Sequence, residues 1–425
     1  MQNFIFISIL SFFLQNIIGY LKFRKLINPI FLFTIIHFFH NWSFSLTRYF
    51  DEFLIWRSDP SVSYDSINDV LYMNLIGGWS FFVIIIFFAN TKKFHQYYKI
   101  DKSKFFLNAY YFLSFIFGLR FISQISGGFI YGENQALDSI SAFDPISRIL
   151  FLRIIFCVFH IILFSNKNNP QLLKILIFES LLSFLMGERK DFILIFLSII
   201  ITVFKNVKLN ILSFLKYSTG ISVISFIMIF IPIYRSIIYT NNIYNQISET
   251  IFIIKEYGMQ IIFYGLNLAN SEGVQNWTYQ LIENGEMKLL YGKSYLQALI
   301  NTVLLRPFQG ETIANWQGSY HFKNIAYPDV TNQGWDFTFT AEAIQNFGSN
   351  FYFISFVLLG FLISFFYQNR HYSDLYKILY YFSWPILAIS FRTDSTSMFR
   401  IFSYVIFLYI FLYYSNRIQL IKDRG

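Results

Sequence analysis

Long apolar runs recur from one end of the chain to the other, and short polar segments separate them. Runs such as FFVIIIFF and FILIFLSIII are continuous, whereas the strands of a membrane β-barrel alternate apolar and polar residues. A helix needs about 20 predominantly apolar residues to cross a bilayer. The pattern therefore predicts an all-α, polytopic helical bundle with about 11 transmembrane helices, at residues 4–21, 26–47, 70–90, 105–126, 146–165, 171–187, 192–204, 209–234, 351–367, 375–391 and 398–414.

Basic residues indicate which ends of these runs face the cytoplasm. If the N-terminus lies outside, the segments that fall inside hold 18 Lys and Arg residues and only three acidic residues, Asp101, Asp374 and Asp423. An excess of Lys and Arg on the cytoplasmic side is the positive-inside distribution. The N-terminus is therefore expected outside and the C-terminus inside.

Composition supports a membrane protein and removes several other classes. Hydrophobic residues make up 55% of the chain and charged residues only 13%, which is unlike a water-soluble fold. The single cysteine, Cys157, excludes an internal disulfide framework. The net charge of +9 is distributed by membrane side and not in one patch, which argues against nucleic acid as a partner.

One polar segment is far longer than the others. Residues 235–350 separate two predicted spans, are mixed in polarity and fall on the outer side in this topology. Helices are expected near 245–270 and 294–305. Long loops in compact proteins are usually functional. The whole chain, 1–425, is therefore predicted to be a single polytopic membrane domain whose large loop, 235–350, carries the chemistry.

Arginine and lysine are distributed differently across the predicted membrane. The inner segments hold 14 Lys and 4 Arg, whereas the outer and embedded positions hold 5 Lys and 10 Arg. The planar guanidinium group suits bidentate recognition of phosphate or carboxylate, so outer Arg residues suggest a bound anion. Pairing with acidic loop residues is the alternative.

Some charged residues lie at or within the apolar runs. The sequence GERKD, at 187–191, joins two runs and is expected either to form a solvated turn or to place Arg189 in a recessed cavity. Arg120 and Arg153 lie within predicted spans, and each needs a partner. Glu179, a ligand phosphate, or snorkelling to the surface would each satisfy this need.

Two side chains of the large loop are candidates for proton transfer. In the stretch FTFTAEAIQNFGSNF, Thr340 is expected to cap a helix that begins at Ala341 and ends before Gly348. Glu342 would then lie in the first turn, either as a general base or as a carboxylate that stabilises the helix dipole. His321 is the only histidine of the loop and has a catalytic or a structural role.

Aromatic residues of the loop suggest contact with sugar rings or with the membrane interface. Three of them, Trp316, Tyr320 and Trp335, are the candidates for sugar binding, and Trp277, Tyr291 and Tyr327 share the same two explanations. No metal-binding, phosphate-loop or nucleophile-elbow motif is present in the sequence, so neither a metal nor a cofactor is expected.

Several of these features together resemble a known family. The span arrangement, the GERKD turn, the Arg that follows a span in IPIYRS, and above all FTFTAEAIQNFGSNFYFISFVLLG are similar to the bacterial O-antigen polymerases, or oligosaccharide repeat unit polymerases. In that family a Glu commonly precedes a short NFG segment, a further Gly, and a Leu- and Gly-rich helix. Asn350 and Phe351 stand here where the second Gly is often found.

The resemblance implies a metal-independent membrane glycosyltransferase with a GT-C-like fold and one large periplasmic loop, in the bacterial inner membrane. The substrate would be an undecaprenyl-pyrophosphate-linked oligosaccharide within the membrane lipid, and the partners would be a chain-length regulator protein and a flippase. Glu342 is the first choice for the catalytic base and His321 the second. The residues expected on the diphosphate are Arg189, Arg235, Arg306, Arg392 and Arg400. An O-antigen ligase acting on lipid A core is the alternative enzyme, and a lipid-linked oligosaccharide flippase or transporter is the alternative of another class.

Overall fold

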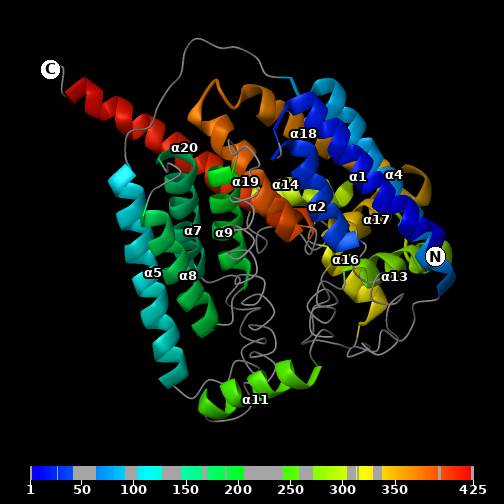
Figure 1. The fold of residues 1–425 in the computed structure, drawn as a ribbon, viewed down its shortest axis with the longest axis horizontal. Coiled ribbons are helices and arrows are strands. Elements are labelled where there is room, and N and C mark those ends of the chain that lie inside the picture. The colour runs from blue at the N-terminus through cyan, green and yellow to red at the C-terminus, as the bar shows by residue number, and fades with distance from the viewer. Residues whose placement is uncertain are drawn as a thin grey trace. The chain divides into compact units, whose positions relative to one another are not determined.

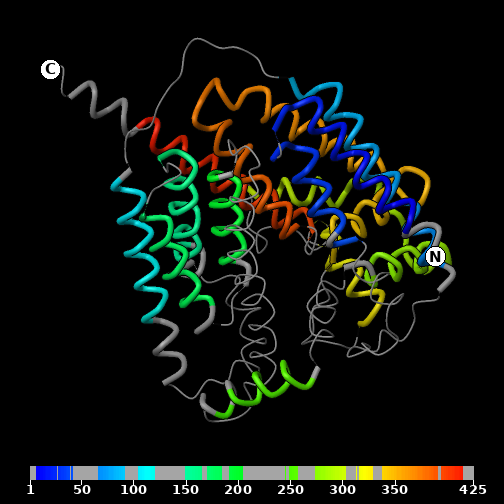
Figure 2. Tube along the Cα trace, in the orientation of Figure 1, coloured from blue at the N-terminus to red at the C-terminus, as the bar shows by residue number. Residues whose placement is uncertain are grey.

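The computed structural model describes thirteen stretches of the chain, and all of its regular structure is helical (Figure 1; Figure 2). The described residues are 2–25, 27–41, 64–90, 103–126, 145–164, 170–186, 189–204, 243–257, 271–303, 313, 315–328, 337–390 and 394–422. They contain fifteen helices and fall into two compact units. The all-α prediction is therefore confirmed.

Unit 1 comprises Met1–Asp101 and Leu266–Gly425. Its helices are α1 (Gln2–Phe23), α2 (Pro29–Asn41), α4 (Tyr64–Phe88), α13 (Ser271–Glu283), α14 (Lys293–Val303), α16 (Gly318–Ala326), α17 (Phe339–Phe351), α18 (Phe353–Asn369), α19 (Asp374–Ser390) and α20 (Ser395–Lys422).

Unit 2 comprises Lys102–Gly265. Its helices are α5 (Ser103–Ser126), α7 (Pro145–Phe164), α8 (Pro170–Met186), α9 (Arg189–Phe204) and α11 (Ile243–Tyr257), and α7 packs against both α5 and α9. The segment 235–350 is thus divided between the units, because α11 belongs to unit 2 and the helices from α13 onward belong to unit 1.

Three described helices are long and apolar enough to cross a membrane by themselves, over Phe6–Phe23, Ser66–Phe88 and Ser395–Tyr414. Helices α17 and α18 are long and apolar enough to cross a membrane only when they are taken together. The chain bends by 118° between them. Ten of the eleven predicted runs coincide with described helices, and the run 209–234 lies outside the described residues. The chain is therefore a multi-pass membrane protein with three or four spans of sufficient length in the part that the structure describes.

Two glycines lie in the contact between α4 and α18, which is the most extensive contact between described helices of unit 1. A Cβ atom at Gly77 would lie 2.7 Å from the ring of Phe356, and one at Gly360 would lie 2.9 Å from the Cβ of Ile84. Small residues let helices approach closely where lipid and side chains are equally apolar.

The helices of the predicted loop in unit 1 have a hydrophobic core of their own. Buried apolar side chains from α13, α16 and α17 form one cluster, and Trp277 and Tyr327 pack against it. The ring of Trp277 meets that of Phe322 edge-on, with centroids 5.4 Å apart. Aromatic packing of this kind stabilises a folded layer. We call α13, α14, α16 and α17 the loop helices.

Helix α17 begins two residues earlier than the sequence suggested. Its N-cap is Thr338, whose Oγ1 accepts a hydrogen bond from the backbone N–H of Ala341 at 2.9 Å, so the prediction of a cap at Thr340 is wrong. Both threonines suit a cap, and the extended backbone of Thr338 decides between them. Gly348 interrupts the helix as expected, with φ 70° and ψ −177°, a conformation that strains other residues.

Candidate functional site

Glu342 lies in the first turn of α17, and its side chain is completely buried. Its Oε1 accepts hydrogen bonds from the hydroxyls of Ser294 at 2.5 Å and Ser395 at 2.8 Å. Its Oε2 accepts a third hydrogen bond from the backbone N–H of Ser395 at 2.7 Å. The carboxyl group therefore joins the start of α14 and the start of α20 to α17.

Asn346, one turn further along α17, holds Ser294 in place. Its Nδ2 donates to the Ser294 hydroxyl at 2.7 Å and to the backbone carbonyl of Glu342 at 2.9 Å. Its Oδ1 accepts from the backbone N–H of Gly292 at 3.0 Å. Gly292 and Tyr291 both have positive φ, which turns the chain into α14 beside α17. This turn brings a serine hydroxyl to the carboxyl group of Glu342.

A second buried carboxyl group, Asp394, directly precedes Ser395. It accepts hydrogen bonds from the Ser319 hydroxyl at 2.5 Å and from Nε2 of Gln317 at 3.0 Å. Both donors come from the beginning of α16. The donors that hold the two carboxyl groups, Glu342 and Asp394, therefore come from the starts of three different helices.

Gly318, between these two donors, lets α16 lie against α17. A Cβ atom at this position would lie 2.9 Å from the ring of Phe337, 3.0 Å from Oε1 of Gln345 and 3.3 Å from Cγ of Glu342. His321 lies one turn further along the same helix. The structure therefore brings the helix that carries His321 into contact with Glu342, the other residue expected to transfer a proton.

His321 is half-buried and held as a neutral imidazole. Burial lowers the pKa of His321, because a charged ring would lose part of its hydration. Its Nε2 is buried and has no hydrogen-bond partner among the described residues. A neutral histidine with an unused ring nitrogen can accept or donate a proton when a ligand arrives.

The site is poor in positive charge where the structure describes it. Neither Glu342 nor Asp394 forms an ion pair with a Lys or Arg side chain within the described ranges. Lys293, the first residue of α14, is exposed, and its Nζ lies 5.7 Å from the centre of the Trp316 ring. This ammonium group is next to Ser294 in the chain. A cation and an aromatic ring therefore lie together at the α14 end of the site.

The structure places only part of the predicted anion site. Arg400 lies on α20 and is exposed, and Arg189 is the first residue of α9, but the side chain of Arg189 is outside the described part. Three more candidates, Arg235, Arg306 and Arg392, lie outside the described residues altogether. Convergence of the Arg side chains on a diphosphate stays a prediction.

Arg153 has protein partners in unit 2. Its Nη1 lies 2.9 Å from each carboxylate oxygen of Glu179, and its Nη2 pairs with Asp191 in the first turn of α9. The hydroxyl of Tyr110 also donates to Glu179, at 2.9 Å. Of the explanations considered for Arg153, the structure supports pairing with Glu179. The side chain of Arg120 lies outside the described part.

The aromatic candidates divide into two groups. Trp316 and Tyr320 are half-buried on or next to α16, beside the residues that hold Asp394. Trp277 and Tyr327 belong to the core of the loop helices, so their main contacts are with other side chains. Trp335 lies outside the described residues.

Sequence reasoning identified none of the donors to the carboxyl group of Glu342, which are Ser294 and Ser395. A signal was present for two of the residues in this network, because Asp394 and Ser395 stand in RTDSTS, directly before an apolar run, which is typical of a helix start. Ser294 and Asn346 had no such signal. Their contact with Glu342 depends on the turn at Tyr291 and Gly292, which is a tertiary feature.

The arrangement can bind a hydroxyl group and accept its proton. Oε1 of Glu342 already accepts hydrogen bonds from two serine hydroxyls. A ligand hydroxyl that replaced one of the serine hydroxyls could donate to Oε1 with the same geometry. Removal from water and a neighbouring carboxylate make an ionised carboxyl group a stronger proton acceptor. Comparison of the chain with protein-family models, curated proteins and solved structures finds no match.

Proposed function

We propose that this chain is a membrane glycosyltransferase of the O-antigen polymerase type. It joins undecaprenyl-diphosphate-linked oligosaccharide repeat units at the periplasmic face of the bacterial inner membrane, without a metal. The observation that carries the proposal is the buried carboxyl group of Glu342, held by two serine hydroxyls in a folded layer of loop helices. The resemblance of the FTFTAEAIQNFG segment to that family supports it.

The proposed topology has eleven spans, an outer N-terminus and an inner C-terminus. The charge distribution supports it, with 18 basic residues and three acidic residues in the inner segments. The loop helices then face the side on which lipid-linked repeat units are assembled. A reporter fused at Gly285 is expected to read periplasmic and one at Ser373 cytoplasmic.

In the proposed reaction a hydroxyl oxygen of the acceptor sugar attacks the anomeric carbon of the donor. A glycosidic bond forms, the bond from that carbon to the diphosphate oxygen breaks, and undecaprenyl diphosphate leaves with the bonding electrons. Glu342 takes the proton of the attacking hydroxyl, which replaces a serine hydroxyl at Oε1. The charge that develops on the diphosphate is stabilised by Arg189, Arg235, Arg306, Arg392 and Arg400.

Trp316 and Tyr320 supply the sugar contacts of this proposal. Both are half-buried near the start of α16, and this helix touches Glu342 through Gly318. An aromatic face packs against the apolar face of a sugar ring. Lys293 beside Trp316 adds a positive charge at the same end of the site.

Glu342→Gln tests the role of the base. The amide keeps the size of the side chain and an oxygen that accepts from Ser294 and Ser395, but it cannot take a proton. With purified protein and lipid-linked repeat units, the polymerisation rate is expected to fall about 10²- to 10⁴-fold, the usual contribution of a general base. Glu283→Gln is the matched control, since this carboxyl group is exposed at the end of α13 and bonds only Ser349 among the described residues.

The folding of the variant has to be measured as well as its activity. In the unaltered protein Oε2 of Glu342 accepts a hydrogen bond from the N–H of Ser395, whereas the amide NH₂ of Glu342→Gln would place a donor against this N–H. Such a mismatch costs about 1–3 kcal/mol. Near-normal polymerisation by Glu342→Gln would overturn the base assignment. Loss of activity in both Glu342→Gln and Glu283→Gln would show a general effect on the layer and would also count against it.

A ligase that uses lipid A core as acceptor is the second candidate, and His321 favours it. Its neutral ring, with an Nε2 that no described residue bonds, suits a catalytic histidine on a helix that touches Glu342. Offering lipid A core and repeat units in parallel separates the two enzymes by product. A flippase would move the lipid-linked oligosaccharide without forming any new glycosidic bond.

A further inference from the structure

Helix α1 carries its polar side chains on the inside. Ser8, Ser11 and Gln15 recur at three- and four-residue spacing, and all three are buried in unit 1. On the opposite face, Phe13 and Ile17 are each 58% exposed. A membrane-spanning helix with this distribution turns its polar face toward a polar cavity or a partner helix, because lipid cannot satisfy polar groups.

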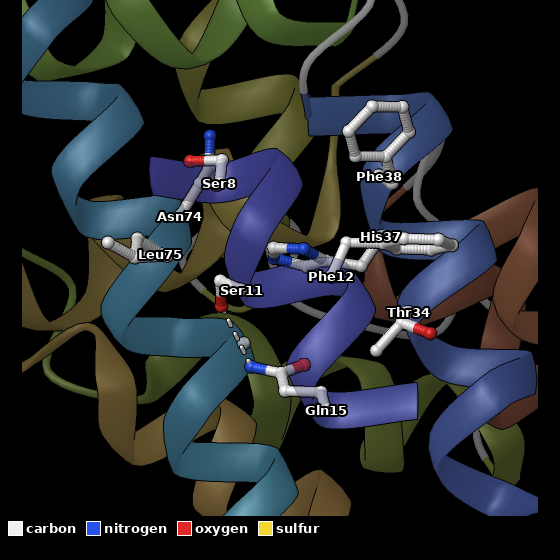
Figure 3. Close-up of a pocket in the computed structure, with 10 residues that line it drawn as sticks. Ser8, Ser11, Phe12, Gln15, Thr34, His37, Phe38, Asn74 and Leu75 are labelled. Atoms are coloured by element: carbon white, nitrogen blue, oxygen red, sulfur yellow. Dashed lines mark hydrogen bonds between the residues drawn. The ribbon is translucent and has the colours of Figure 1, made fainter. Parts of the chain in front are cut away.

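The polar face of α1 lines a small cavity, shown in Figure 3 together with the facing side chains of α2 and α4. Thr34 and His37 of α2 and Asn74 of α4 complete its polar lining. The cavity has a volume of about 30 Å³. A bound water needs about 10–15 Å³ of such space, so the cavity has room for about two water molecules.

The side chains that line the cavity restrict what can bind there. Among the described residues that surround the cavity, none is Asp, Glu, Lys or Arg. A phosphate or a metal ion would therefore lack a charged partner there, and burying it would be costly. The ligand that fits is small, neutral and able to form hydrogen bonds.

Asn74 provides a place for one such bond. Its Nδ2 donates to Oε1 of Gln275 at 2.9 Å and to the backbone carbonyl of Asn41 at 3.4 Å. A backbone carbonyl can only accept, so this contact identifies the nitrogen side of the amide. Oδ1 of Asn74 is buried and accepts no hydrogen bond from any described residue. An acceptor left in this state costs about 1–3 kcal/mol.

The same asparagine belongs to a chain of hydrogen bonds that leads to the candidate site. Gln275 of α13 donates from Nε2 to Oδ1 of Asn41 at 2.6 Å, and the hydroxyl of Thr340 donates to the same atom at 3.3 Å. Thr340 lies two residues before Glu342 on α17. The cavity is therefore linked through fixed side chains to the helix that holds the carboxyl group.

We propose that the cavity is a hydration site within the membrane helices, which binds one or two water molecules, one of them donating to Oδ1 of Asn74. This water completes the hydrogen bonding of Asn74 and anchors the chain of amides that ends on α17. The site is separate from the carboxyl group of Glu342 and does not depend on the reaction proposed for it.

Radiolytic footprinting in lipid nanodiscs tests the proposal. Hydroxyl radicals made from bound water in H₂¹⁸O should oxidise the lining residues Phe12 and His37 with incorporation of ¹⁸O. We expect this oxidation to be about fivefold or more faster than that of Phe13, whose exposed face meets lipid and not water. Equal rates for Phe12, His37 and Phe13 would show a dry cavity and overturn the proposal.

Asn74→Leu tests the binding atom. Loss of Oδ1 should lower the oxidation of Phe12 and His37 several-fold, whereas Ser364→Ala, a buried hydroxyl removed from α18 of the same unit, should leave it unchanged. Unchanged oxidation in Asn74→Leu would show that Asn74 does not hold the water. If this variant fails to fold, the comparison of the three residues in the unaltered protein still decides whether the cavity is hydrated.

Discussion

Removal of Glu179 should destabilise unit 2 because it leaves Arg153 buried without its main partner. Arg153 is 2% exposed and Glu179 is fully buried, and one guanidinium nitrogen lies 2.9 Å from both carboxylate oxygens. Breaking a buried ion pair by removing one partner typically costs about 3–5 kcal/mol. Asp191 keeps one contact to Arg153, so we expect Glu179→Leu to cost about 3 kcal/mol, at the lower end of that range.

The double variant Arg153→Met with Glu179→Leu separates the ion pair from simple packing. It removes the isolated charge together with its partner, and apolar replacements of buried ion pairs are often neutral or stabilising. The double variant is therefore expected to be more stable than Glu179→Leu alone, although Asp191 then loses its partner Arg153.

Unfolding by a denaturing detergent, added to the purified protein in mild-detergent micelles, measures the free energies of unfolding of the unaltered protein, Glu179→Leu, Arg153→Met and the double variant. A non-additive double-mutant cycle is the expected result. A cost below about 1 kcal/mol for Glu179→Leu, or a double variant less stable than the single one, would refute the reasoning.

Two further predictions concern the loop helices. Gly318→Ala places a Cβ 2.9 Å from the ring of Phe337 and 3.3 Å from Cγ of Glu342, so it should cost about 1–3 kcal/mol and lower the unfolding temperature; an unchanged temperature would mean that α16 does not approach α17 this closely. The lowered pKa of His321 means that the unfolded chain binds its proton more readily, so the stability that the neutral ring contributes is present above pH 6.5 and is lost as the pH falls below it. His321→Gln should therefore lose less stability than the unaltered protein between about pH 7.5 and about pH 5.5, and an equal loss in thermal unfolding would contradict this assignment.

The helices of the membrane part follow from the pattern of apolar residues. An apolar run long enough to cross a bilayer has to satisfy its backbone hydrogen bonds internally, and a helix does this from local residues alone. Ten of the eleven runs are helices for this reason. The break at Gly348 is local too, since its positive φ suits glycine above other residues.

Partner choice required the tertiary structure. From the sequence, Arg153 could pair with Glu179, bind a ligand phosphate or snorkel to the surface. Only the packing of α7 against α9 and the position of Glu179 on α8 select the carboxylate. The sequence pattern predicted Thr340 as the cap of α17, whereas the backbone geometry places the cap at Thr338.

The candidate site shows the same division. The sequence by itself determined that Glu342 stands near a helix start, because capping residues and a terminating glycine are local signals. Only the tertiary structure decided that Ser294, 48 residues away, and Ser395, 53 residues away, donate to its carboxyl group. Contacts between residues so far apart in the sequence depend on which helices pack together. The apolar runs that drive this packing are too similar to one another for the sequence to specify their partners.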